Sequence, residues 1–312
     1  MPQHRIIIDC DPGQDDAVAL LLALASPAEI EIAAVTTVAG NVGLPLTTRN
    51  ALRVLELAGH REIPVHPGCP RPILRLLETA EYVHGKSGLD GADLPEPTRA
   101  PAAEHAVDVI VAEIMGRPPG TVALCPLGPL TNVALAIVKQ PEIVPRIKEI
   151  VLMGGSMELG KVTAAAEFNI YVDPHAARVV FEAGAPIVML GLDVTHKALV
   201  TDDRLARIKA IDTPVSRACA GLLDFFNRYD KERYQVSGAP LHDPCVIAYL
   251  LRPDLFRGQL RRVEIETEGT HTSGRTVVDW WRRSDRPANA LVINDVDDDG
   301  FFALLTERLA RL

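Results

Sequence analysis

The most informative stretch of the sequence is Arg5-Ile6-Ile7-Ile8-Asp9-Cys10-Asp11-Pro12-Gly13-Gln14-Asp15-Asp16-Ala17. Its apolar start predicts a short buried strand, and residues 17–25 predict the helix that follows. Four carboxylates therefore lie where a strand ends and a helix begins, which is where open parallel sheets bind ligands. The glycine-rich phosphate loop of nucleotide-binding folds does not occur in this stretch. Because buried anions must be neutralised by a cation or by protons, the stretch predicts a metal site.

Strand-like and helix-like runs alternate over the first two thirds of the chain. Strands are expected near 30–38, 63–65, 121–125, 149–153 and 186–191, with helices near 46–58, 103–115, from 132, 174–183 and 202–211. This alternation predicts an α/β fold with a mainly parallel open sheet and helices on both faces. The segment 67–101 is rich in Pro and Gly and is too long for an ordinary connection, so we expect it to be functional or mobile.

The pattern changes beyond residue 212. Long helices are expected at 215–232 and up to 251, and a last helix at 297–310. Strand-like runs at 260–268, 275–281 and 290–293 predict a small antiparallel addition at the C-terminal end. Neither linker composition nor an internal repeat divides the chain, so we expect residues 1–312 to form a single domain.

Composition narrows the class of protein. The chain has 312 residues, 47% of them hydrophobic, which is typical of a soluble globular protein with a substantial core. A net charge of −9 argues against nucleic acid and anionic membranes as partners. The five cysteines are scattered and have no metal-type spacing, which predicts free thiols in a reducing cytosol. With neither a long apolar targeting region nor a run that could span a membrane, we expect a cytoplasmic location.

The spacing of the acids favours one shared site. Asp9 and Asp11 are two residues apart, so they point the same way on a strand. Asp15 and Asp16 open a helix, where N–H groups favour anions, and either one alone could be a helix cap. Capping needs only one carboxylate, so four favour a hard cation. Calcium is preferred over magnesium if several protein oxygens and a bidentate carboxylate contribute.

Residues 9–17 closely resemble the N-terminal signature of the nucleoside hydrolases, the inosine–uridine preferring family. The resemblance continues in family order and at similar spacing through Val38-Ala39-Gly40-Asn41, Leu127-Gly128-Pro129-Leu130-Thr131-Asn132, Val151-Leu152-Met153-Gly154-Gly155, Ala166-Glu167-Phe168-Asn169 and His242-Asp243. It implies a Rossmann-like nucleoside hydrolase fold and an N-glycosyl hydrolase of nucleoside salvage and catabolism. Such an enzyme releases a free base and ribose from a ribonucleoside, and the blocks resemble its pyrimidine-preferring and broad-specificity branch.

The resemblance also implies a calcium site. Asp11, Asp16, the backbone carbonyl of Leu127 and Asp243 match its ligand positions. Asp11 also matches the base that takes a proton from a water activated by the calcium, and cleavage would pass through an oxocarbenium-like transition state.

Substrate contacts follow from the same resemblance. Asp15 and Asn41 match the positions that contact the 2′ and 3′ hydroxyls of the ribose. Met153 matches the ribose floor, and Glu167 and Asn169 match contacts on the 5′ side of the sugar. His242 matches the acid that assists the leaving base, although without the resemblance a structural histidine that caps the start of a helix is the simpler interpretation. His84 is a second residue expected near the base, and Tyr229 and Tyr234 are expected to cover it. The neighbouring Phe225 and Phe226 have the spacing of core residues.

One position departs from the family pattern. Lys161 stands where the family usually has an asparagine near the ribose 5′ end. Lysine is a strongly hydrated cation, so a side chain that points to solvent is the simpler expectation. The sharper hypothesis is altered 5′ recognition, with tolerance of a 5′-phosphorylated or modified nucleoside.

Two other classes of protein remain open. A haloacid-dehalogenase-like phosphatase would use Asp9 and Asp11 with magnesium, but the downstream blocks favour a nucleoside hydrolase. A non-catalytic calcium-binding protein would need no His242, and no EF-hand pattern occurs. We therefore expect a small-molecule ribonucleoside as the partner and, as in relatives, a homo-oligomer, either a tetramer or a dimer.

Overall fold

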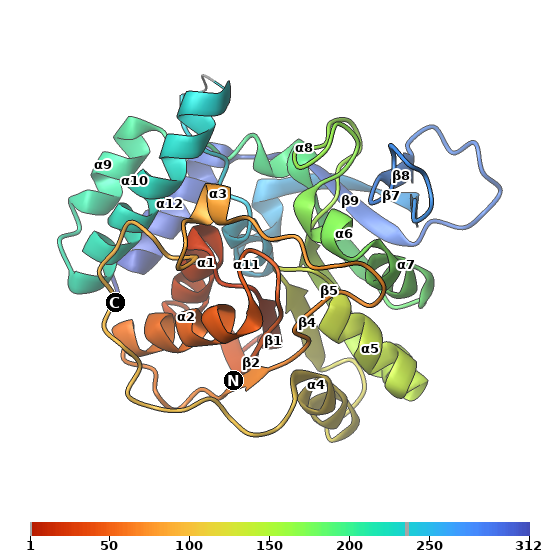
Figure 1. The fold of residues 1–312 in the computed structure, drawn as a ribbon, viewed down its shortest axis with the longest axis horizontal. Coiled ribbons are helices and arrows are strands. Elements are labelled where there is room, and N and C mark those ends of the chain that lie inside the picture. The colour runs from red at the N-terminus through yellow and green to blue at the C-terminus, as the bar shows by residue number, and fades with distance from the viewer. Residues whose placement is uncertain (1, 235–236) are drawn as a thin grey trace.

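The fold is built around one mostly parallel sheet (Figure 1). The computed structural model describes residues 2–234 and 237–312, and the side chain of Tyr234 lies outside the described part. Nine strands of the described residues follow the order β3-β2-β1-β4-β5-β6-β9-β7-β8. Their bounds are β1 His4–Cys10, β2 Ile30–Thr37, β3 Val65–Pro67, β4 Val122–Pro126, β5 Ile147–Met153, β6 Ile187–Leu190, β7 Phe256–Ile265, β8 Thr276–Asp279 and β9 Ala290–Val296.

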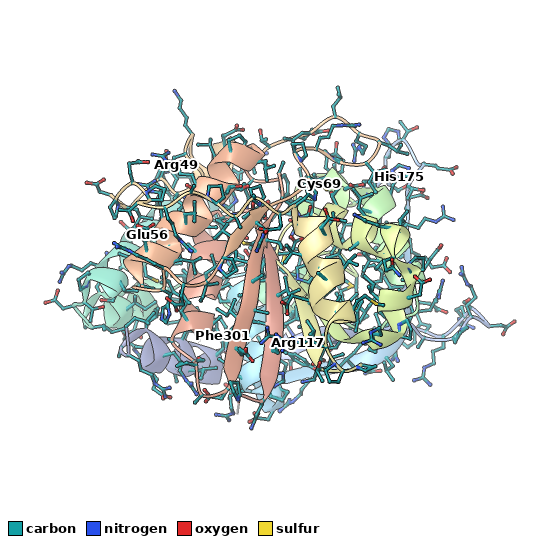
Figure 2. The ribbon with its side chains drawn as sticks, turned by 90° about the horizontal axis from the view of Figure 1, so that it is seen from below. Arg49, Glu56, Cys69, Arg117, His175 and Phe301 are labelled. Atoms are coloured by element: carbon teal, nitrogen blue, oxygen red, sulfur yellow. The ribbon has the colours of Figure 1, made fainter. Side chains whose placement is uncertain are left out.

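Helices cover both faces of this sheet. They are α1 Gln14–Leu24, α2 Leu44–Leu57, α3 Glu81–His84, α4 Ala106–Met115, α5 Thr131–Lys139, α6 Phe168–Val172, α7 Pro174–Glu182, α8 Leu192–Thr195, α9 Asp202–Lys209, α10 Pro214–Tyr234, α11 Pro244–Leu251 and α12 Asp298–Leu309, with 3-10 turns η1 Pro141–Arg146 and η2 Pro253–Leu255. Figure 2 shows the strands between two helical layers. This layered arrangement confirms the predicted α/β fold class.

The pleat of β1 separates two hydrophobic cores. Ile6 and Ile8 belong to the core under α1, α2 and α9–α12, whereas Ile7 belongs to the core under α4, α5 and α7. All three isoleucines are fully buried, because both faces of the strand are covered. A continuous apolar run such as residues 6–8 is the pattern expected of a strand that is buried on both faces. The prediction of a buried strand there is confirmed, since β1 pairs with both β2 and β4.

The topology places a ligand crevice between β1 and β4. The chain runs outward from β1 through β2 to β3, then returns to the other side of β1 with β4 and continues to β5 and β6. The strand order therefore reverses at the β1–β4 pair, which is parallel. Loops leave in opposite directions from the carboxyl ends of such a pair and open a crevice between them. The acidic stretch after β1 and the loop after β4 both begin at this crevice.

The C-terminal strands divide between two arrangements. β7 pairs antiparallel with β9, and β8 pairs antiparallel with β7, as the predicted antiparallel addition requires. β9 itself pairs parallel with β6 and so extends the main sheet.

The segment 67–101 contains the short helix α3. All five cysteines are buried free thiols, as predicted. Among the described residues, no helix is both long and apolar enough to span a membrane.

Candidate active site

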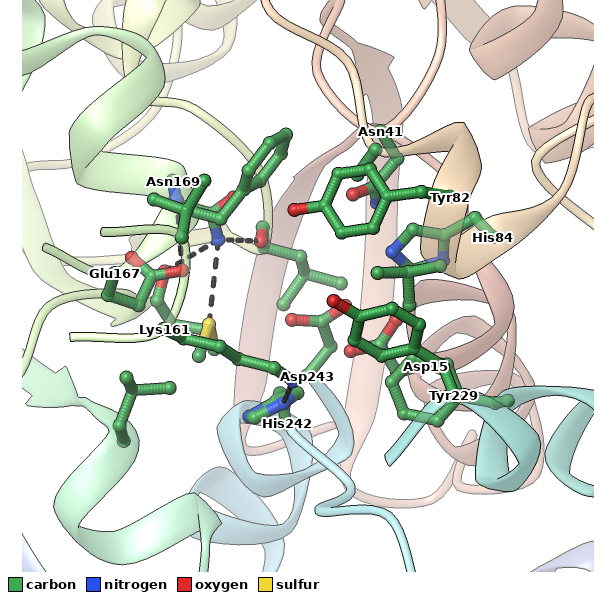
Figure 3. Close-up of a pocket in the computed structure, with 18 residues that line it drawn as sticks. Asp15, Asn41, Tyr82, His84, Lys161, Glu167, Asn169, Tyr229, His242 and Asp243 are labelled. Atoms are coloured by element: carbon green, nitrogen blue, oxygen red, sulfur yellow. Dashed lines mark hydrogen bonds between the residues drawn. The ribbon is translucent and has the colours of Figure 1, made fainter. Parts of the chain in front are cut away.

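A pocket opens above the carboxyl ends of β1 and β4 (Figure 3). Its wall comes from segments far apart in the chain: the start of α1, the loops after β2, β4 and β5, helices α3 and α10, and the segment before α11. The predicted residues that line it are Asp15, Asn41, His84, Leu127, Met153, Glu167, Asn169, Tyr229, His242 and Asp243.

Buried carboxylates form one end of the pocket. Oxygen atoms of Asp15, Asp16 and Asp243 all lie within 4.8 Å of one another, and all three residues are buried. Asp16 is fixed from two sides, because Gly13 N donates to its Oδ2 at 2.9 Å and Asp11 N to its Oδ1 at 3.2 Å. Hard oxygen donors grouped in this way could hold a divalent cation.

Asp11 lies beside this group and is held rigidly. Asn41 N donates to its Oδ2 at 2.7 Å, and the Asn41 side-chain amide bridges Asp11 O and Asp16 Oδ2. A Cβ on Gly40 or on Gly128 would collide with the Asp11 carboxylate, so the two glycines allow the backbone to enclose it. Oδ1 of Asp11 is buried and has no hydrogen-bond partner among the described residues, and the same holds for Oδ1 of Asp15.

Electrostatics shows that these acids need a counter-charge. Burial raises the pKa of Asp16 to about 7, and the negative charge of Asp15 adds to this shift. Burial also raises the pKa values of Asp11 and Asp243 well above their usual range, with further contributions from neighbouring carboxylates. Carboxylates packed together out of water cannot all ionise at neutral pH unless a cation joins them. The raised pKa values and the unpartnered oxygens therefore fit a divalent cation.

Asp9 lies below the acids and supports the strand ends. Its Oδ1 accepts hydrogen bonds from Thr36 Oγ1 at 2.6 Å and from Asn132 Nδ2 at 2.8 Å. Asn132 in turn donates to Thr37 O and accepts from Cys69 N. Asp9 thus ties β1 to β2 and to the start of α5, and it does not line the pocket.

The loop after β5 forms the side of the pocket opposite α10. Glu167 accepts from Gly155 N and Asn169 N, so its carboxylate caps α6 and orders the loop. Asn169 Nδ2 donates to the carbonyl of Leu127 at 2.6 Å and to that of Met153 at 3.2 Å. A carbonyl oxygen has two lone pairs, so Leu127 O keeps one for a second partner.

His242 lies next to Asp243 in the wall of the pocket and is in contact with a lysine. Thr195 Oγ1 is 2.7 Å from His242 Nδ1, and Lys161 Nζ is 2.9 Å from His242 Nε2. Since an ammonium group can only donate, Nε2 accepts and the ring proton is on Nδ1. Burial, reinforced by the charge of Lys161, lowers the pKa of His242 well below its usual range.

A comparison with known protein families shows to which family the chain belongs. The model of the inosine–uridine preferring nucleoside hydrolases matches residues 6–303. The chain belongs to this family. It is similar to the pyrimidine-specific ribonucleoside hydrolase RihA of Photobacterium profundum, with 52% identity over 98% of both chains.

Solved structures agree with this assignment. A plant nucleoside hydrolase, the PpNRh1 enzyme, has a TM-score of 0.92 with 33% identity, and the match covers 99% of both chains. A purine-preferring ribonucleoside hydrolase from Gardnerella vaginalis has a TM-score of 0.92 with 34% identity over 98% of both chains. The predicted family and Rossmann-like fold are confirmed, and the chain is an N-glycosyl hydrolase rather than a phosphatase.

Aromatic rings and a second histidine complete the pocket of this nucleoside hydrolase. The Gln14 amide nitrogen donates to two backbone carbonyls, so the amide oxygen Oε1 faces His84. Because this oxygen can only accept, His84 Nδ1 donates to it at 2.7 Å. Burial lowers the pKa of His84 to about 3, so Nε2 is an acceptor. Tyr229 packs against Tyr82 with 5.5 Å between ring centroids. The predicted contact of Tyr234 lies outside the described residues.

Three features of the pocket were not predicted. Lys161 does not point to solvent: its side chain is 18% exposed and reaches His242. Phe226 packs in a core as expected, but it also lines the pocket. Asp230 is a buried acid 3.9 Å from Lys161 Nζ. Asp230 follows Phe226 by four residues on α10, so helical spacing alone places both on one face and could have identified it.

Proposed function

We propose that this nucleoside hydrolase is calcium-dependent and prefers pyrimidine ribonucleosides, releasing the base and ribose. The observation that carries the calcium dependence is the group of buried carboxylates at the pocket, two of which have an oxygen with no partner among the described residues. The pyrimidine preference is supported by the 52% identity to a pyrimidine-specific enzyme, against 34% for the purine-preferring structure.

The proposed cation ligands are Asp11, Asp16, Asp243 and the Leu127 carbonyl. Asp15 lies within 4.8 Å of Asp16 and Asp243 and also lines the pocket, so it can face the cation and a ribose hydroxyl together. When bound, Ca²⁺ supplies the charge that offsets these acids and acidifies a water in contact with it. Oxygen-only ligation favours calcium or magnesium over zinc.

Asp11 is the proposed general base. Its Oδ2 is held by Asn41 N at 2.7 Å, which leaves Oδ1 to accept the proton of the attacking water. The rigid enclosure by Gly40 and Gly128 keeps this oxygen in one orientation. A fixed base contributes to the rate because the reacting atoms need no further ordering.

The remaining polar groups would grip the ribose. Asp15 and Asn41 are proposed for the 2′ and 3′ hydroxyls, and Glu167 and Asn169 for the 5′ side, with Met153 as the floor. These residues line one pocket and their backbones are fixed by caps and strand ends. As the C1′–N bond breaks, positive charge develops on the sugar, and the surrounding carboxylates favour that charge.

Base release from purified enzyme tests the proposal. Uridine, cytidine, inosine and adenosine are each incubated with chelated enzyme and with enzyme reloaded with Ca²⁺, and free base is quantified by chromatography. We expect release only with Ca²⁺, with a higher kcat/KM for uridine than for inosine. No release from any of the four with Ca²⁺ present contradicts the activity, and a faster reaction with inosine contradicts the pyrimidine preference alone.

A further inference from the structure

Lys161 extends across the pocket toward the end at which His242 lies (Figure 3). Its backbone lies in the loop after β5, beside Glu167, but its Nζ is 2.9 Å from His242 Nε2. The ammonium therefore lies beside His242, which the family resemblance places near the leaving base. This position does not favour recognition of a 5′-phosphate.

Three groups hold the ammonium in place. His242 accepts its hydrogen bond, and Thr195 fixes the other nitrogen of the same ring. Asp230 Oδ1 lies 3.9 Å from Nζ, and Oδ2 of this buried acid has no partner among the described residues. The Phe226 ring lies 5.9 Å from Nζ, within the range of a cation–π contact.

This arrangement leaves donors for a ligand. An ammonium carries three N–H donors, and His242 accepts one of them. His242 Nε2, in contrast, is occupied as an acceptor and cannot donate to a base in this arrangement. Lys161 therefore keeps N–H groups that can donate to a ligand in the pocket, which His242 does not in this arrangement.

We propose that Lys161 is a catalytic residue that donates a hydrogen bond to the leaving base, with His242 and Asp230 as its positioning residues. The inference rests on the proposed function, because it assigns a role within the same reaction. The family pattern has an asparagine where this chain has Lys161. Stabilisation of the leaving base by an ammonium group is therefore a feature of this chain.

The chemistry of the leaving group explains why a cation is useful there. When the C1′–N bond breaks, its electron pair goes to the base, and in a pyrimidine the charge spreads to the adjacent 2-carbonyl oxygen. The water oxygen bonds to C1′ as Asp11 takes the proton that the water loses; Asp11 then releases this proton to solvent, and the base nitrogen gains a proton from solvent. A fixed ammonium stabilises the anionic base more than the neutral nucleoside, so it lowers the barrier.

Two substrates with different leaving groups test the role. Uridine needs stabilisation of its departing base, whereas 4-nitrophenyl β-ribofuranoside releases nitrophenolate, a good leaving group that needs little help. We expect Lys161→Met to reduce kcat for uridine by about 100-fold or more. The same variant should retain the nitrophenyl riboside rate within about threefold and leave inhibition by ribose unchanged, since the ribose and cation contacts are intact.

Matched variants separate charge from structure. Lys161→Arg keeps a cationic donor and should recover part of the uridine rate. Lys139→Met removes an exposed lysine on the distant helix α5 and should leave both rates unchanged. Circular dichroism and thermal unfolding of each variant report whether the fold is kept.

The outcomes distinguish this inference from the proposed function. If the wild type cleaves both substrates and Lys161→Met is as active as wild type on uridine, the role of Lys161 is overturned. An equal loss on both substrates also overturns it, because the lysine would then serve the sugar or the fold. If the wild type cleaves neither substrate with Ca²⁺ present, the proposed function itself fails.

Discussion

Asp11 is the single residue on which the proposed chemistry depends most. Its two oxygens have different surroundings, since Oδ2 accepts from Asn41 N and Oδ1 has no partner among the described residues. We expect Asp11→Asn to lower kcat by about 1,000-fold, because an amide of the same shape cannot take a proton. At pH values high enough to ionise the buried acids, the chelated variant should also unfold at a higher temperature than chelated wild type, because one buried like charge is removed. Steady-state kinetics and thermal unfolding measure the two effects, and an Asp11→Asn variant with wild-type kcat would exclude Asp11 as the base.

Gly40 is required for steric reasons. A Cβ there would collide with the Asp11 carboxylate and with Pro129, and neither can move away easily in a buried site. We expect Gly40→Ala to reduce kcat/KM by about 100-fold, the scale of a displaced catalytic group. Gly43→Ala is the matched control, because the nearest atom to its Cβ would be 3.9 Å away. Similar kinetics for the two variants would show that the enclosure of Asp11 has no catalytic effect.

At the residue scale, the sequence predicted the acids better than the lysine. Asp9, Asp11, Asp15 and Asp16 are short side chains, so their backbone positions nearly determine where their oxygens lie. Lys161 has a long flexible side chain, and its direction depends on His242 and Asp230, which come from distant parts of the sequence. Such a contact cannot be read from local spacing.

At the scale of elements, one asparagine holds several strand ends together. Asn132 at the start of α5 donates to Asp9 Oδ1 and Thr37 O and accepts from Cys69 N. We expect Asn132→Ala to lower the free energy of unfolding by about 3 kcal/mol, because three buried groups lose a partner. Urea unfolding followed by circular dichroism measures the change.

The control for this prediction lies on the same helix. Val138 is 59% exposed, so Val138→Ala should change the stability by less than about 0.5 kcal/mol. Equal stability of Asn132→Ala and Val138→Ala would contradict a structural role for the asparagine.

Hydrophobic patterning predicted most elements but not their pairing. The central strands and the long helices were expected close to where they lie, because their apolar patterns are long and regular. The short helices α3, α6 and α8 have too few residues to show a period. The parallel pairing of β9 with β6 joins residues about a hundred positions apart, and no local signal in either strand specifies its partner.

At the scale of the whole molecule, the buried acids should make stability depend on pH. Burial raises the pKa of Asp9 and of Asp15 to about 6 and that of Asp16 to about 7, all above the ordinary value. Raised pKa values in the folded state mean that it binds more protons than the unfolded chain. Their stabilising contribution is therefore full below about pH 4 and is lost as the pH rises through 6 to 7.

Thermal unfolding at several pH values measures this effect. We expect the unfolding temperature of the chelated protein to fall between about pH 5 and about pH 8, and Ca²⁺ to raise it by several degrees at the higher pH but much less at the lower. A chelated protein that becomes more stable over this range would contradict the proposed electrostatics.

Two whole-molecule expectations stay predictions. One is that residues 1–312 form a single domain, and the other is that the chain assembles into a tetramer or dimer. The residues that line the pocket run from Asp15 at the start of α1 to Asp243 just before α11, so segments far apart in the chain form one site.

The proposed reaction depends above all on a calcium ion at the buried acids, which we expect to be required for hydrolysis of the N-glycosidic bond. The most direct test titrates chelated enzyme with Ca²⁺ while measuring both bound metal per chain and uracil released from uridine. We expect activity to rise in proportion to bound Ca²⁺ and to reach its maximum at one tightly bound ion per chain, with neither binding nor activity in Asp16→Asn. Full activity in enzyme shown to contain no divalent metal would show that hydrolysis needs no cation at the buried acids.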